Sequence, residues 1–144
     1  MALNFNKYIQ KANVFINEVA IELGYPEDKD GAIRVLRAVL HALRNKIPPQ
    51  ESLQLIAELP MLIKAVYVDG WTMREEPRKI RHLADFLESV RKEDGAAGQY
   101  DFGGDYTTEI AIKAVFRVLK RHVSAGEITD ISKTLPAEIR ALMA

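Results

Sequence analysis

The side chains with the widest chemical repertoire in this sequence are its three histidines, His41, His82 and His122. Histidine binds metal ions and transfers protons near neutral pH. The nearest approach to a ligand pair is His82 with Asp85, whereas a zinc site takes three or four protein ligands. Cysteine, which could complete such a set, is absent from the chain. We therefore expect surface or half-buried histidines and no metal.

Signatures of catalysis are also absent from the sequence. There is no Gly-x-Ser-x-Gly elbow and no Gly-x-x-x-x-Gly-Lys-Ser/Thr phosphate loop. Without cysteine the chain can form no disulfide, iron–sulfur cluster or thiolate nucleophile. The sequence thus predicts a protein that is not an enzyme, with no catalytic residues and no cofactor.

Five aromatic side chains are the candidates for contact with a ligand or partner: Tyr67, Trp71, Tyr100, Phe102 and Tyr106. The first two bracket the end of an expected helix, where a tryptophan ordinarily packs with its indole N–H near a carbonyl. The other three lie among glycines and aspartates in residues 94–106, which we expect to be the one long loop. We expect this loop to fold back as a lid over the core, and a docking surface is the alternative.

The elements that position these side chains are predicted to be helices. Apolar residues recur at three- and four-residue steps, as on the buried face of an amphipathic helix. In the first helix this predicted buried stripe begins with Phe5, Tyr8 and Ile9. Gly24 is expected to end the first helix, over residues 4–23. Breaks follow at Pro48-Pro49 and Leu59-Pro60. No stretch alternates as a strand would, so we expect an all-α bundle of seven or eight helices.

Local patterns make finer predictions. Asp30 is expected to cap the second helix, and the outward face of that helix is expected to carry Arg34, Arg37, His41 and Arg44. Ser124 and Glu127 fit a capping box, in which serine accepts from a backbone N–H and glutamate reaches back to the N-cap.

The two halves of the sequence resemble each other, which indicates an internal repeat. Shifted by 76 positions, residues 32–67 lie on residues 108–143 without a gap, and both Leu-Pro steps coincide. Two such units bury their apolar faces most readily against each other. We therefore predict one domain, residues 1–144, built from pseudo-symmetric copies over about 1–72 and 78–144, joined by a loop at 72–77.

Composition limits the class of protein. The chain of 144 residues has 20 basic and 20 acidic side chains, so its formal net charge is zero. This balance weakens any role based on contact with phosphate backbones. No secretory signal or run of about twenty apolar residues is present, and we expect a cytoplasmic protein without a membrane segment.

A short helix, a Leu-Pro step and a last helix can mimic a helix-turn-helix, which places basic side chains beside DNA phosphates. Only Arg140 and its counterpart Lys64 lie on the would-be recognition helices, although Arg117, Lys120 and Arg121 add a basic cluster. A solvated helix face explains these charges, so nucleic-acid binding is the less favoured interpretation.

Several segments together resemble the DUF2267 family: Arg37–Arg44, Leu59–Leu62, Asp69–Trp71, Phe86–Val90 and, further on, Gly126-Glu127, Leu135-Pro136 and Ile139–Leu142. The resemblance covers nearly the whole chain. It implies a bacterial helical protein of unknown function, and it supplies no catalytic residues. Residues 96–106 look longer than the family's usual linker.

The hypothesis that these observations favour is a non-catalytic interaction or regulatory module that binds another protein or itself, as a homodimer. The alternatives are nucleic-acid binding through the helix-turn-helix-like units and small-ligand binding in a cleft between the repeats.

Overall fold

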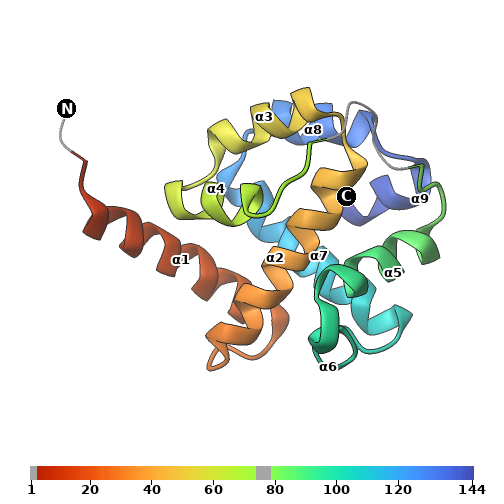
Figure 1. Ribbon diagram of the computed structural model, residues 1–144, viewed down its shortest axis with the longest axis horizontal. Coiled ribbons are helices and arrows are strands. Elements are labelled where there is room, and N and C mark those ends of the chain that lie inside the picture. The colour runs from red at the N-terminus through yellow and green to blue at the C-terminus, as the bar shows by residue number, and fades with distance from the viewer. Residues whose placement is uncertain (1–2, 74–78) are drawn as a thin grey trace.

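The computed structural model describes residues 3–73 and 79–144 and is helical throughout (Figure 1). Within these residues it has nine α-helices, two 3-10 segments and no strand, which confirms the all-α fold. The helices are α1 (Phe5–Leu23), α2 (Lys29–Lys46), α3 (Pro49–Glu58), α4 (Met61–Val68), α5 (Leu83–Glu93), α6 (Gly98–Phe102), α7 (Asp105–His122), α8 (Ala125–Lys133) and α9 (Ala137–Arg140). The 3-10 segments are Gly95–Ala97 and Ala141–Met143. No helix in the described ranges is both long and apolar enough to cross a membrane.

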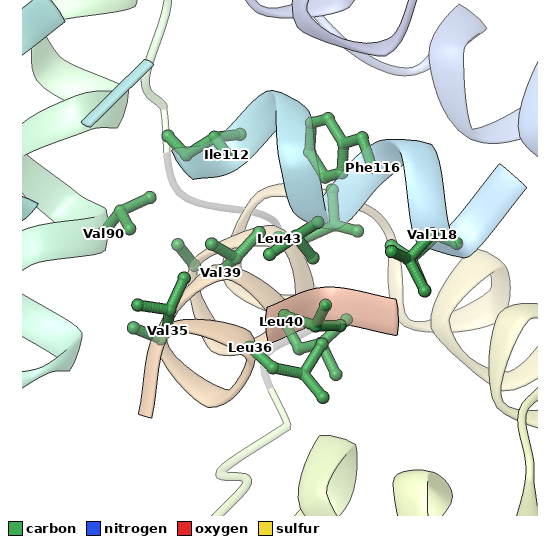
Figure 2. Packing of buried hydrophobic residues seen from close by; sticks show 14 of the residues in the cluster. Val35, Leu36, Val39, Leu40, Leu43, Val90, Ile112, Phe116 and Val118 are labelled. Atoms are coloured by element: carbon green, nitrogen blue, oxygen red, sulfur yellow. The ribbon is translucent and has the colours of Figure 1, made fainter. Parts of the chain in front are cut away.

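The core forms where α2 and α7 face each other. Figure 2 shows apolar side chains of both helices meeting, with Val90 of α5 beside them. Leu36, Leu40, Ile112 and Phe116 in this region are almost fully buried. α1 packs on both central helices, and α5 packs on them from another side. Because α2 and α7 each contact several helices, they position the rest of the chain.

The helix boundaries follow the spacing seen in the sequence. α7 occupies the positions 76 residues after those of α2, and the starts of α3 and α4 are likewise 76 residues before those of α8 and α9. The structural symmetry of the two proposed copies, and their bounds at 1–72 and 78–144, stay predictions. Most of the expected connecting loop at 72–77 lies outside the described residues.

The start of α2 and the side chains on its outward face differ from the prediction. Its N-cap is Asp28, whose carboxylate accepts the Gly31 N–H at 3.0 Å, so the expectation for Asp30 was wrong. His41 and Arg44 are buried, not outward.

Their side chains turn inward because they satisfy the open end of α4. His41 Nε2 donates to the Val66 carbonyl at 2.7 Å, and Arg44 Nη1 donates to the Tyr67 and Asp69 carbonyls at 2.7 and 2.8 Å. The last carbonyls of a helix have no partner within it. Burial lowers the pKa of both side chains, which keeps His41 neutral.

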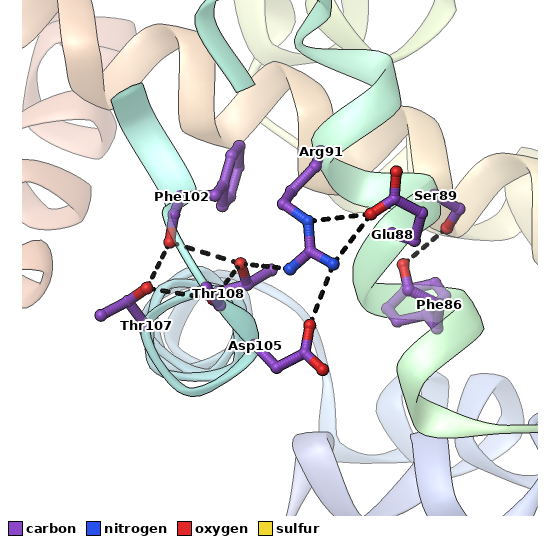
Figure 3. A network of polar contacts seen from close by, with 9 residues as sticks. Phe86, Glu88, Ser89, Arg91, Phe102, Asp105, Thr107 and Thr108 are labelled. Carbon is purple, nitrogen blue, oxygen red and sulfur yellow. Dashed lines mark hydrogen bonds and ion pairs between the residues drawn. The ribbon is translucent and has the colours of Figure 1, made fainter. Parts of the chain in front are cut away.

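Residues 94–106 are not a loop. They form a 3-10 turn, α6 and the start of α7. Phe102 is buried, and its carbonyl accepts hydrogen bonds from the hydroxyls of Thr107 and Thr108. Figure 3 shows Arg91 joining this turn to α5: Nη1 donates to Thr108, and Nη2 donates to Glu88 and Asp105. The glycines allow a compact helical corner, and no lid is formed.

Gly98 has a steric reason to be glycine in this corner. A Cβ placed there would lie 2.5 Å from the Arg91 carbonyl oxygen, which is backbone and cannot rotate away. We expect Gly98→Ala to lower the free energy of unfolding by about 1–3 kcal/mol, as overpacking does. The matched control is Gly126→Ala in α8, where a Cβ meets nothing within 4 Å. That change should stabilise the helix by up to about 1 kcal/mol. Equal urea midpoints for the two variants would contradict this explanation.

The start of α8 is capped by Ser124, which is in turn hydrogen-bonded to a side chain of α3. Ser124 Oγ accepts the Glu127 N–H at 3.2 Å, as a capping box requires. The return bond is missing, because the Ser124 N–H donates to Glu58 Oε1 of α3 at 2.8 Å. Glu127 instead turns inward and is only 6 % exposed. The predicted capping box is therefore right in one half and wrong in the other.

Candidate functional site

The first helix carries an apolar stripe that continues beyond the core. Asn4 caps α1, with its side chain accepting the Lys7 N–H at 3.1 Å, and Gly24 ends it at φ 91°. The buried residues of α1 all lie at or after Ala12, and they are Ala12, Phe15, Ile16, Val19 and Ala20. Phe5 and Ile9 precede Ala12 by seven and three positions, which places them on the same helix face.

These earlier members of the stripe are open to solvent. Phe5 is 68 % exposed and Ile9 is 48 % exposed, while Tyr8 between them is half-buried and contacts the Phe5 ring edge-on at 6.4 Å. In Figure 1 the N-terminal half of α1 extends away from the rest of the molecule. We call residues 3–11 the α1 arm. Its apolar face is the part of the core stripe that no other described segment buries.

The other side of the arm is polar and basic. Lys7 and Lys11 are exposed and lie about half a turn around the helix from Phe5 and Ile9. The first acidic residue of α1 is Glu18. The arm thus presents an apolar face and a positively charged back.

The second half of α1 is held firmly against α7. Arg117 Nε lies 3.0 Å from Glu22, and Arg121 pairs with both Glu18 and Glu22. His122 Nε2 lies 2.6 Å from Glu18, and its ring packs on Phe15 with centroids 4.8 Å apart. The hydrogen bonds of the two arginines lower the pKa of Glu22. The arm therefore extends from an anchored helix and is presented at a fixed position.

The aromatic candidates from the sequence do not form one site. Tyr67 is fully buried, and its hydroxyl is hydrogen-bonded to Ser52 Oγ at 2.6 Å. Trp71 is half-buried and packs edge-on against Tyr67 at 6.0 Å. Phe102 is buried, whereas Tyr100 and Tyr106 are exposed. Burial excludes Tyr67 and Phe102 as surface contacts, because neither presents its ring to solvent. The prediction that Trp71, Tyr100 and Tyr106 contact a ligand or partner stays a prediction.

The histidines are likewise separated. His41 lies in the core. His82 is exposed, with Nδ1 3.2 Å from Glu138 Oε2. His122 is the last residue of α7 and lies beside Glu18 of α1. Across residues 3–73 and 79–144, no group of three or more His, Asp or Glu side chains is placed to hold a metal ion.

The basic side chains of the helix-turn-helix-like units have protein partners. Arg140 donates to the Ser132 and Leu135 carbonyls at 2.9 and 2.8 Å, and Lys64 donates to the Ala57 carbonyl at 3.4 Å. The contacts of Arg140 lie at the end of α8, and the single contact of Lys64 lies at the end of α3. A groove also lies beside α1, lined by Lys11, Val14, Glu58, Leu59, Pro60 and His122. It adjoins the face of α1 opposite to Phe5 and Ile9.

Sequence reasoning missed the arm. It assigned Phe5, Tyr8 and Ile9 to the buried stripe, because their spacing is the same as that of the core residues. Periodicity finds the face of a helix and does not show where its neighbours end.

The comparisons give a family and no activity. A family model described as an uncharacterized conserved protein, DUF2267, matches residues 12–142. The match begins at the first buried residue of α1, so the arm precedes it. No curated protein matches the chain.

Proposed function

The chain belongs to the DUF2267 family, and we propose that it is a non-catalytic interaction module that pairs with a second copy of itself through the apolar face of the α1 arm. The observation that carries this proposal is the exposed continuation of the core stripe at Phe5 and Ile9. Apolar side chains that lie together and face water favour association, because burying them removes apolar area from contact with water.

A second copy suits this face because the stripe is self-complementary. In an antiparallel pair of arms centred between Tyr8 and Ile9, Tyr8 of one copy lies opposite Ile9 of the other, and Phe5 packs beside them at each end of the contact. A twofold axis makes each of these contacts occur twice.

Charge allows the same arrangement. Lys7 and Lys11 point away from the apolar face, so two arms can meet without bringing their lysines together. Antiparallel helices also place opposite ends of their dipoles side by side.

The expected affinity is modest. Two arms can bury on the order of 600–800 Å², below the roughly 1,200 Å² at the lower end of stable interfaces. We therefore expect a weak, reversible dimer whose population responds to the local protein concentration. Such a response is the regulatory behaviour that we propose.

Nucleic-acid binding is the weaker proposal for two reasons. Arg117 and Arg121 already pair with Glu22 and Glu18. The arm has only two lysines, and phosphate contacts of this number give little affinity at physiological salt.

Sedimentation velocity over a concentration series from about 10 to 500 µM tests the pairing. The wild-type sedimentation coefficient should rise with concentration, and the double variant Phe5→Lys/Ile9→Lys should stay monomeric because it places charge in the contact. The matched control is Val14→Lys/Ile21→Lys, since Val14 and Ile21 are 56 % and 63 % exposed on the opposite face of α1.

The control variant should dimerise as the wild type does. A monomeric wild type at all concentrations, or loss of the dimer only in the Val14→Lys/Ile21→Lys protein, would contradict the proposal.

A further inference from the structure

The contact between α3 and α8 contains two carboxyl groups that face each other. Glu127 of α8 is 6 % exposed and Glu51 of α3 is half-buried. One oxygen of each, Glu127 Oε1 and Glu51 Oε2, is buried with no donor from the described residues within reach. A buried carboxylate oxygen without a donor is costly, so this arrangement needs an explanation.

The explanation is a proton held between the two groups. The side chains of Glu51 and Glu127 lie within hydrogen-bonding reach of each other, and carboxylates have no hydrogen to donate unless one of them is protonated. Two like charges at such a separation cannot both persist in a poorly solvated contact. With one proton between them, one of the two carboxyl groups donates a hydrogen bond and the other accepts it.

In the described part of the chain, the charged groups that act most strongly on Glu127 are all acidic. The groups that act on Glu127 are Glu51 and Glu58 from α3, Asp130 from its own helix and, from α4, the Tyr67 phenol. Burial first, and then these acidic neighbours, raise the pKa of Glu127 to about 7. Glu58 is itself engaged with the Ser124 N–H and hydroxyl at the start of α8.

We propose that Glu51 and Glu127 form a pH-sensitive latch, in which one shared proton holds α8 against α3 and its loss loosens that contact. α3 contacts α8 and α4, and Figure 1 places α3 and α8 side by side at the edge of the molecule. An opening there leaves α2 and α7 in place.

The sign of the pH dependence follows from the raised pKa. The folded protein keeps a proton that the unfolded chain releases near pH 4.5, so folding is favoured on the acid side. This contribution diminishes as the pH rises and is lost once the pH passes about 7.

The variant Glu127→Gln tests the latch, because its amide is neutral at every pH and can donate to Glu51. Between pH 5.5 and 8 we expect the ratio of the wild-type unfolding constant to that of Glu127→Gln to rise roughly 30-fold, as a pKa raised from 4.5 to about 7 requires. Urea unfolding at both pH values measures it. The control is Glu27→Gln, which changes an exposed glutamate and should give a constant ratio.

Hydrogen exchange shows where the change occurs. At pH 8, amides of α8 should exchange about tenfold faster in the wild type than in Glu127→Gln, and those of α2 should exchange equally. Glu51→Gln removes the same charge pair from the other side and should behave like Glu127→Gln, which covers the case in which one variant folds poorly. A constant ratio in urea, or equal exchange of α8 in all proteins, would overturn the proposal.

Discussion

Phe15→Ala is expected to lower the free energy of unfolding by about 3–5 kcal/mol, the cost of removing a fully buried phenylalanine. Phe15 is 0 % exposed and packs against the ring of His122. Its loss leaves a cavity at the contact between α1 and α7, and the ion pairs of Glu18 and Glu22 alone cannot hold that contact. Urea unfolding followed by circular dichroism measures the change.

The corresponding change at Phe5, ten positions earlier on the same helix face, should weaken the dimer and leave the stability of the monomer nearly unchanged. Phe5→Ala removes an exposed ring of the same helix face, so the monomer's stability should change by no more than about 0.5 kcal/mol. Its effect should appear in the dimer alone. A loss of monomer stability comparable to that of Phe15→Ala would show that the arm packs within its own chain, and the α1 arm would then not be a free surface.

Arg44→Ala is expected to cost about 2–4 kcal/mol. Its guanidinium donates from Nη1 to the carbonyls of Tyr67 and Asp69 at the end of α4. Hydrogen bonds that involve a charged group are worth more than neutral ones, and a buried carbonyl left without its donor is costly. The end of α4 should become exposed to hydrogen exchange in the variant.

Arg37→Ala is the control for this prediction. Arg37 lies on the same helix with a half-exposed side chain, and its contact with Asp69 is a 3.9 Å ion pair at the surface. Surface pairs of this kind contribute little, so stability should stay within about 0.5 kcal/mol of the wild type. Equal losses for the two arginine variants would mean that Arg44 does not act through the α4 carbonyls.

Much of the fold could be predicted because local signals mark the helix ends. Gly24 adopts the left-handed conformation that ends α1, and proline precedes the first residue of α4 and α9. The apolar spacing of α2 and α7 identifies the face that enters the core. Each of these features depends on residues close together in the chain, so the sequence displays it directly.

The burial of His41 and Arg44 could not be predicted in this way. Their positions look like a solvated face, and only the arrival of the α4 carbonyls, about 25 residues further along the chain, makes them interior. The prediction of a loop at residues 94–106 was wrong for another reason. Glycines usually break helices, but here Gly98 allows α6 to approach the Arg91 carbonyl closely.

The candidate site was even less accessible to sequence reasoning. Phe5 and Ile9 continue the buried pattern, and only the arrangement of the other helices leaves them exposed. Glu127 fits a capping motif, yet Glu58 from another helix takes its expected role. In both cases the deciding neighbour is distant in sequence, and periodicity cannot identify it.

Cross-linking is the most direct test of the proposal that the apolar face of the α1 arm joins two copies. The natural chain has no cysteine, so Ile9→Cys and Ile21→Cys each introduce a single thiol on opposite faces of the same helix. With a short thiol-reactive cross-linker, Ile9→Cys should give a covalent dimer whose yield rises with protein concentration, while Ile21→Cys stays monomeric. Equal yields from both variants, or no dimer from Ile9→Cys, would contradict the account.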